Sequence, residues 1–396
     1  MKRLPAITLV VCAVSMAARA DTFVVLPFFN QTNSANLDWI GESLSEITRE
    51  ALASEGLLTL DREDRIEAYH RLSLRPYALL TKGSVIKIGE TLDAEHVIYG
   101  RFDLKPAASG EPAARGSLQI TASILDLKHL RQTPDYSEVG SLEDLAILQR
   151  HLAYQTLTLV APRSAPSEEE FNGRHPAVRV DAIENYIRGL LAAAPAEKHR
   201  LFTQAARLDA RFSQPCFQLG KLSWQSKDFK VAEEWLQKVS SADVHYREAN
   251  FLLGLCRYQS GDFAGAQEAF QLVARTVPLN EVLNNLGAAA SRRSQPEALD
   301  DFRKAMEGDP SDPDYQFNTG YALWKKGDFD AAAERFRAVL ARDPRDSEAN
   351  TMLGRCLSRN GPRPGDTKTE GLERLKTSYE ESAWWQLQAA LQPAKP

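Results

Sequence analysis

One thirteen-residue pattern recurs three times in this chain, and the recurrence constrains the fold more than any other feature. It is FQLGKLSWQSKDF at 217–229, FLLGLCRYQSGDF at 251–263 and FNTGYALWKKGDF at 317–329. The interval between the second and third copies is close to twice the interval between the first and second, so a further unit fits between them. A period of about 34 residues is typical of stacked helical hairpins, whose apolar faces are buried only against neighbouring copies.

Each copy has a glycine in its expected first helix, which lets the second helix approach closely. The glycines are Gly220, Gly254, Gly287, Gly320 and Gly354. Weaker copies start near residues 186, 284 and 351, and the last is interrupted by GPRPGDTKTEG. The pattern predicts an all-α solenoid of about five to six helical hairpins over residues 177–396. We expect its end to be a capping helix that carries Trp384 and Trp385.

The preceding residues alternate between strand and helix patterns. Strands are expected at 23–29, 57–64, 96–102 and 117–127, and helices at 37–55, 66–74, 85–94 and 142–160. The last strand alternates apolar and polar residues, so one of its sides should face solvent. This order predicts an α/β domain over 21–160, with a mixed sheet and covering helices. A flexible loop is expected at 106–116, and a linker at 161–176, which is rich in Pro, Ser and Glu.

The repeats resemble the tetratricopeptide family over roughly residues 180–392. The stretches VVLPFFN, LDWIGESLSEITREAL, LLTLDRED, LDAEHVIYGRF and ITASILDL resemble the amino-terminal domain of the TolB translocation protein. They are also similar to its relatives in the curli-secretion and FlgO-type envelope families. This second resemblance covers about 22–160 and implies an interaction or assembly module of the bacterial envelope. The first implies a solenoid that binds proteins or peptides.

A stripe at positions i, i+4 and i+7 of each first helix lies about a third of a turn from the glycine stripe. It comprises Phe217, Lys221, Trp224, Phe251, Leu255, Tyr258, Phe317, Tyr321 and Trp324. In the unit between, the stripe becomes Asn284, Ala288 and Ser291. The family resemblance implies that this stripe lines a concave groove for peptide ligands. The two interpretations that stay open are a partner-binding surface and packing between hairpins.

The first twenty residues are typical of a secretion signal. A basic start is followed by a short apolar core, and Ala18-Arg19-Ala20 is a small-x-small cleavage site. We therefore expect cleavage after Ala20 and export to the periplasm, with no membrane insertion of the mature chain. Its three cysteines lie among apolar neighbours and are expected to be buried.

Catalytic signatures are not recognisable in the sequence. It has no phosphate-loop, dinucleotide-binding or metalloprotease motif, and its seven histidines form no metal spacing. A net charge of −5 without a basic block disfavours nucleic acid as a partner. We expect no enzyme activity, no cofactor and no metal. The sequence favours a non-enzymatic periplasmic scaffold whose groove binds a protein or peptide and whose α/β domain docks to an envelope component. The alternative is a small-ligand sensor or enzyme that uses α/β loops near Asn30, Arg62 and Arg101.

Overall fold

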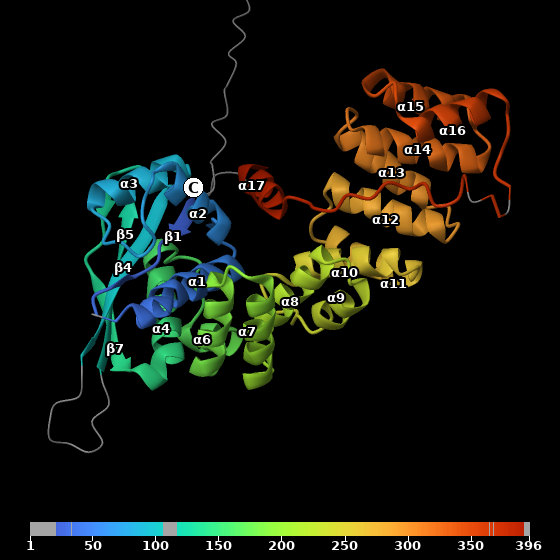
Figure 1. The fold of residues 1–396 in the computed structure, drawn as a ribbon. Coiled ribbons are helices and arrows are strands. Elements are labelled where there is room, and N and C mark those ends of the chain that lie inside the picture. Colours follow the sequence, from blue (N-terminus) through green and yellow to red (C-terminus); the bar gives the residue numbers. More distant parts are fainter. Residues whose placement is uncertain (1–20, 33, 106–116, 364, 367, 392–396) are drawn as a thin grey trace, which may run out of the picture.

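The computed structural model describes residues 21–391 except 33, 106–116, 364 and 367. The signal segment and the expected 106–116 loop lie outside these residues. Figure 1 shows an α/β domain followed by a curved array of helices. The expected fold class is therefore confirmed.

A mixed seven-stranded sheet forms the centre of the α/β domain. Its strands are β1 (Thr22–Val25), β2 (Phe29–Asn30), β3 (Leu58–Thr59), β4 (His96–Lys105), β5 (Ser117–Asp126), β6 (Arg131–Gln132) and β7 (Tyr136–Ser141). The order is β3-β1-β4-β5-β6, with β2 also on β4 and β7 also on β5. β1 is parallel to β3 and β4, whereas β4, β5 and β7 form an antiparallel ribbon.

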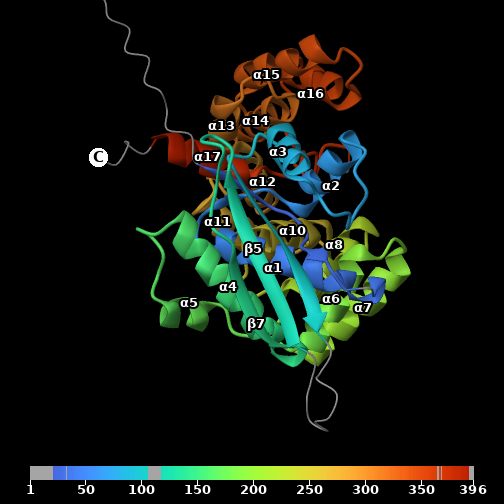
Figure 2. The same cartoon turned by 90° about the vertical axis from the view of Figure 1, so that its left-hand side faces the viewer.

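Helices cover both faces of the sheet (Figure 2). On one face lie α1 (Asp38–Ser54) and α4 (Leu145–Val160), and on the other α2 (Arg62–Arg71) and α3 (Lys82–Thr91). β5 alternates as expected only in its first half, since residues 122–125 are all buried. There Leu125 packs against the α2 and α3 side while Ile124 belongs to the α1 and α4 side.

Two expected strands are shorter than the sequence indicated. The strand at 23–29 is divided into β1 and β2 around Pro27, which has no N–H to donate to a sheet. The strand at 57–64 is reduced to Leu58–Thr59, because Asp61 begins α2 with a reciprocal capping box to Asp64. β6 and β7 were not anticipated.

A short helix, α5 (Glu168–Arg174), lies in the residues expected as a linker. Ser167 and Glu170 form a capping box at its start. Phe171 is fully buried, with its ring 5.3 Å from that of Tyr154 and 4.4 Å from that of His175. This segment is therefore packed against the α/β domain.

Five helical hairpins form the array. They are α6 (Val180–Leu191) with α7 (Pro195–Leu208), α8 (Gln214–Gln225) with α9 (Phe229–Leu236), α10 (Tyr246–Gln259) with α11 (Phe263–Ala274), α12 (Asn280–Arg292) with α13 (Ala298–Gly308), and α14 (Pro313–Lys326) with α15 (Phe329–Arg342). A single helix, α16 (Ser347–Leu357), follows. The first hairpin shares one apolar core with the sheet, through Ile183, Tyr186 and Phe202.

The last helix, α17 (Glu381–Leu391), does not lie at the end of α16. From α16 the chain runs back along the array, and α17 lies beside β3 of the α/β domain (Figure 1). The expectation that this helix caps the solenoid is therefore not met. Among the described residues no second helix forms a hairpin with α16, and Gly354 is exposed.

The glycine position of the repeat can be tested with a matched pair of variants. A Cβ at Gly254 would lie 2.7–2.9 Å from the Phe270 ring, whereas a Cβ at Gly354 would meet nothing within 4 Å. We expect Gly254→Ala to lower the free energy of unfolding by about 1–3 kcal/mol through overpacking. Gly354→Ala should raise it by up to about 1 kcal/mol through helix propensity. Chemical denaturation of both variants checks this, and equal effects would contradict the close-contact role.

Candidate functional site

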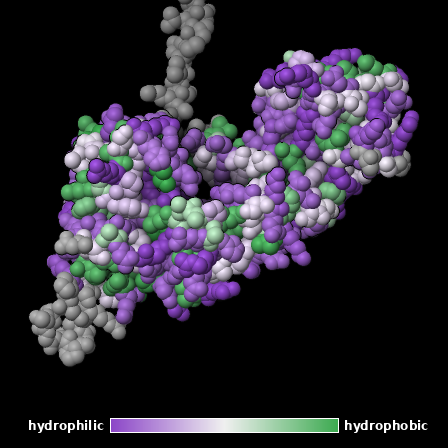
Figure 3. Space-filling view, in the orientation of Figure 1, coloured by the Kyte–Doolittle hydropathy of each residue, from purple (hydrophilic) through white to green (hydrophobic). Residues whose placement is uncertain are grey.

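The first helices of successive hairpins form the inner face of the array. Most of the aromatic stripe lies on this face but is buried: Phe217, Phe251, Leu255, Phe317, Tyr321 and Trp324 are each at most 2% exposed. Lys221, Trp224 and Tyr258 are partly exposed. On the face seen in Figure 3, hydrophobic residues are scattered among polar ones across both domains.

The chain itself covers much of this face. Residues 369–379, here called the strap, run across α14, α12 and α10 on the way from α16 to α17. Figure 1 shows this segment crossing the array. Thr369 and Glu373 of the strap are buried. Over α10, α12 and α14 the predicted stripe is therefore covered by an extended segment of the same chain.

Two asparagine side chains hold the main chain of the strap. Asn318 accepts from the Arg374 N–H at 2.8 Å and donates to the Arg374 carbonyl at 2.7 Å. Asn285 makes the same pair of bonds to Lys376, at 2.8 and 2.7 Å. Each amide thus satisfies both main-chain groups of one strap residue, as a neighbouring β-strand would.

The two asparagines occupy the same position of the repeat, one period apart on α12 and α14. The earlier hairpin holds the later strap residue, so the strap runs antiparallel to the order of the hairpins. Arg374 and Lys376 are alternate residues, which matches the two-residue period of an extended chain. Asn284 adds a bond of 2.8 Å to the Arg374 carbonyl.

The basic side chains of the strap lie among carboxylates. Arg374 lies 2.8 Å from Asp346 and 3.0 Å from Glu348, and its guanidinium is 3.8 Å from the Phe317 ring centre. Lys376 lies 2.7 Å from both Asp312 and Asp314. Burial alone would lower the pKa of Lys376, but its hydrogen bonds to these two aspartates outweigh that effect and raise it.

The other strap side chains complete the contact. Glu373 accepts from Ser291 at 2.6 Å and lies 3.7 Å from Lys325. Leu375 packs against the apolar clusters of the middle and far hairpins, and the Tyr379 ring lies 4.7 Å from Phe251. Tyr321 donates to the Thr369 carbonyl at 2.6 Å. Burial beside Glu373 raises the pKa of Tyr321, so it stays protonated and can donate.

The sequence interpretation missed the residues that hold the strap. The unit with Asn284, Ala288 and Ser291 looked like a gap in the aromatic stripe. In the structure Asn284 and Ser291 supply polar contacts to the strap. One signal was present: Asn285 and Asn318 occupy the same repeat position, which is apolar or Gln in the units at 218, 252 and 352.

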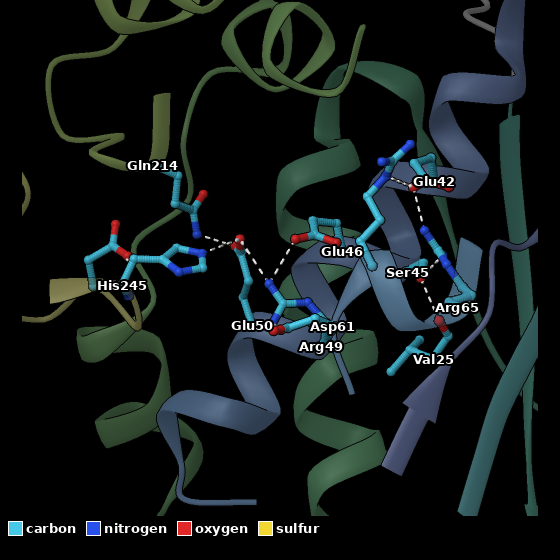
Figure 4. A network of polar contacts seen from close by, with 12 residues as sticks. Val25, Glu42, Ser45, Glu46, Arg49, Glu50, Asp61, Arg65, Gln214 and His245 are labelled. Carbon is cyan, nitrogen blue, oxygen red and sulfur yellow. Dashed lines mark hydrogen bonds and ion pairs between the residues drawn. The ribbon is translucent and has the colours of Figure 1, made fainter. Parts of the chain in front are cut away.

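The near end of the stripe lies at the junction with the α/β domain. The Phe217 ring stacks on His245 at 4.4 Å, and His245 lies 3.8 Å from Glu50 on α1. Figure 4 shows His245 and Gln214 pointing toward Glu50. Glu50 also forms an ion pair with Arg49. Gln214 donates to Glu50, and Arg49 pairs with Glu46 at 2.8 Å and Asp61 at 3.3 Å.

The charges of this junction are strongly coupled. Burial by itself would raise the pKa of Glu46, but Arg49 lowers it to about 2. Burial raises the pKa of Glu50 to about 7 against the opposing effects of His245 and Arg49. Burial would lower the pKa of His245, but the neighbouring Glu50 raises it above its ordinary value. Glu50 and His245 therefore each bind a proton more tightly in the folded protein than in the unfolded chain.

Each α/β residue of the alternative hypothesis has a carboxylate partner. Asn30 donates to Asp38 at 2.7 Å, Arg62 pairs with Glu42 at 2.7 Å, and Arg101 pairs with Asp135 at 3.2 Å. Within the described ranges no cluster of His, Cys, Asp or Glu could hold a metal ion. Cys216, Cys256 and Cys356 are buried and unpaired in disulfides. A search of the described helices finds none long and apolar enough to cross a bilayer.

Comparison with known proteins agrees with the hairpin geometry. The tetratricopeptide repeat family model matches residues 217–281 and 317–361. These residues form tetratricopeptide repeats. No enzymatic family is indicated, and no curated protein matches the chain at a significant level.

Solved repeat structures are similar to part of the chain. MamA 41-end from Desulfovibrio magneticus RS-1 is 23% identical, covering 40% of this chain and 92% of its own, with a TM-score of 0.37. YrrB, described as a tetratricopeptide repeat protein with an unusual peptide-binding site, is 21% identical over 48% of this chain and 95% of its own, with a TM-score of 0.36. A further MamA crystal structure is 18% identical over 41% of this chain and 96% of its own, with a TM-score of 0.37.

The junction predicts a pH dependence of stability. Because burial raises the folded pKa of Glu50 to about 7, its contribution to stability is present at low pH and lost as pH rises through about 7. The raised pKa of His245 adds a loss of stability in the same direction. We expect the free energy of unfolding to fall between about pH 5 and about pH 8, by at most about 1.4 kcal/mol per pH unit for each proton released. Chemical denaturation across this range measures the slope. Glu50→Gln should flatten it, whereas Glu268→Gln, which removes an exposed carboxylate, should not. A slope unchanged by Glu50→Gln would contradict the assignment.

Proposed function

We propose that this protein is a non-enzymatic scaffold of the periplasm. Its repeats hold a peptide segment of a partner protein along their inner face, and its TolB-like α/β domain docks to another envelope component. The observation that carries the proposal is the strap. The inner face already holds an extended main chain through paired amide bonds from Asn285 and Asn318. A surface that binds one extended peptide in this way has the chemistry to bind another.

The uncovered part of the inner face supports contact with a partner. Lys221, at the α8 end of the stripe, is 39% exposed. Trp224 nearby is partly exposed and packs on Phe229. Tryptophan is among the residues that most often dominate the binding energy of protein interfaces. The array therefore offers a surface that continues from the strap toward the α/β domain.

The pattern of the first twenty residues supports the location in the proposal. Residues 1–20 have the pattern of a secretion signal. The full sequence has a net charge of −5, which disfavours nucleic acid as a partner. We expect the mature chain to start at Asp21 and to be released with the periplasmic fraction. Mass spectrometry of the chain recovered from fractionated cells checks the amino terminus. An intact Met1 in the cytoplasmic fraction would overturn the location.

An in-cell crosslink tests the scaffold. A photo-reactive residue at Lys221 should give one discrete adduct with a partner protein, because this side chain lies on the inner face and is partly exposed. The matched control is Lys230 on α9, an exposed position on a second helix. Mass spectrometry identifies the adducts. No adduct from Lys221, or equal adducts from both positions, would contradict use of the inner face.

A further inference from the structure

The acidic wall beside the strap exists independently of the strap. Asp312 Oδ1 caps α14 by accepting from the Asp314 and Tyr315 N–H groups, at 2.8 and 3.3 Å. Asp346 Oδ1 caps α16 by accepting from the Ala349 N–H at 2.9 Å. Capping fixes both carboxylates in the fold and leaves each Oδ2 directed at a basic strap residue. With Asp314 and Glu348 they form a patch of four carboxylates that requires a positive partner.

The spacing of the contacts defines a sequence pattern. Arg374 and Lys376 are held by Asn318 and Asn285 and face the acidic wall. Leu375 between them packs on the apolar clusters, and Tyr379 reaches Phe251 three residues after Lys376. Thr377 and Ser378 are exposed. The inner face therefore selects an extended segment of the form basic-aliphatic-basic, followed by an aromatic residue at the third position beyond.

The strap is bound by its extended main chain and its side chains, with no helix or strand of its own. It is covalently joined to the array through α16, so it competes with any external peptide at a high effective concentration. Release of the strap would expose Asn285, Asn318 and the acidic wall together. The same event would free the chain that leads to α17, whose Trp385 lies 5.5 Å from Arg247 on α10.

We propose that the inner face is a receptor for an extended peptide with this basic-aliphatic-basic and aromatic pattern, and that the strap holds the site in cis until such a peptide displaces it. The inference rests on the proposed function and specifies its ligand. The occupant is a segment of a partner protein. The alternative occupant, which the test below distinguishes, is the strap of a second copy of this chain.

The test uses the full chain with the strap weakened in place. Arg374→Glu combined with Lys376→Glu sets two negative side chains against the acidic wall and should release the strap. The probe is a labelled synthetic peptide of residues 369–381. We expect the double variant to bind it at least about tenfold more tightly than the unaltered chain, whose own strap occupies the site. The matched control, Arg363→Glu with Lys368→Glu, makes the same charge change at exposed positions near the strap and should behave like the unaltered chain.

A second peptide carrying the two charge reversals tests the pattern. It should bind the double variant at least about tenfold more weakly than the first peptide. Equal binding of both peptides, or no binding by a folded double variant, would overturn the proposal. Concentration-dependent dimers of the unaltered chain that disappear in the double variant would show exchange between copies and would also overturn it. These outcomes are separate from the in-cell crosslink, which tests whether the inner face has a partner at all.

A chain with a protease site provides a second test if the double variant does not fold. A specific protease site inserted after Arg363, an exposed position, lets the chain fold first and be cut afterwards. The released fragment should stay bound and be displaced by excess unlabelled 369–381 peptide, but not by the charge-reversed peptide. A fragment that neither peptide displaces would show that the strap is a permanent part of the core.

Discussion

The contact between a first-helix glycine and a second-helix aromatic ring sets the geometry of the array. Four hairpins use a glycine against a phenylalanine ring, and the remaining one uses Gly220 against Leu236. The four pairs are Gly189 with Phe202, Gly254 with Phe270, Gly287 with Phe302, and Gly320 with Phe336. Each pair brings two helices close together, so that successive hairpins stack at a regular spacing. That regularity places the same helix position of neighbouring hairpins along one line. Asn285 and Asn318 lie on such a line, and their spacing allows them to hold alternate residues of one extended chain.

The α/β domain and the array are joined by two different kinds of contact. The first hairpin continues the apolar core of α1 and α4, which fixes the array against the sheet. Next to it, α1 presents Glu46, Arg49 and Glu50 to the second and third hairpins through Gln214 and His245. A buried charge network is costly to disrupt from one side, and it also demands a particular geometry. Glu50 therefore contacts both the second and the third hairpin.

The sequence was sufficient for features that depend on local periodicity. The repeat period, the glycine contacts and the main helices of the α/β domain follow from residue spacing, and the structure has them. Capping was underestimated: Asp61 starts α2 where a strand was expected, and Ser167 starts α5 inside an expected linker. The strap was beyond such reasoning, since it depends on the return of residues 369–379 to helices that lie several repeats earlier in the chain. The two asparagines that hold it lie one position after the aromatic stripe, so the stripe pattern does not include them.

The path of the chain end has a mechanical consequence. A solenoid in which each hairpin contacts only its neighbours can bend with little resistance, because no contact spans more than one unit. Here the strap contacts α10, α12 and α14 in turn. Straightening of the array would move these helices apart along the strap and break its contacts before those between the hairpins. The strap therefore acts as a brace that fixes the curvature of the repeats.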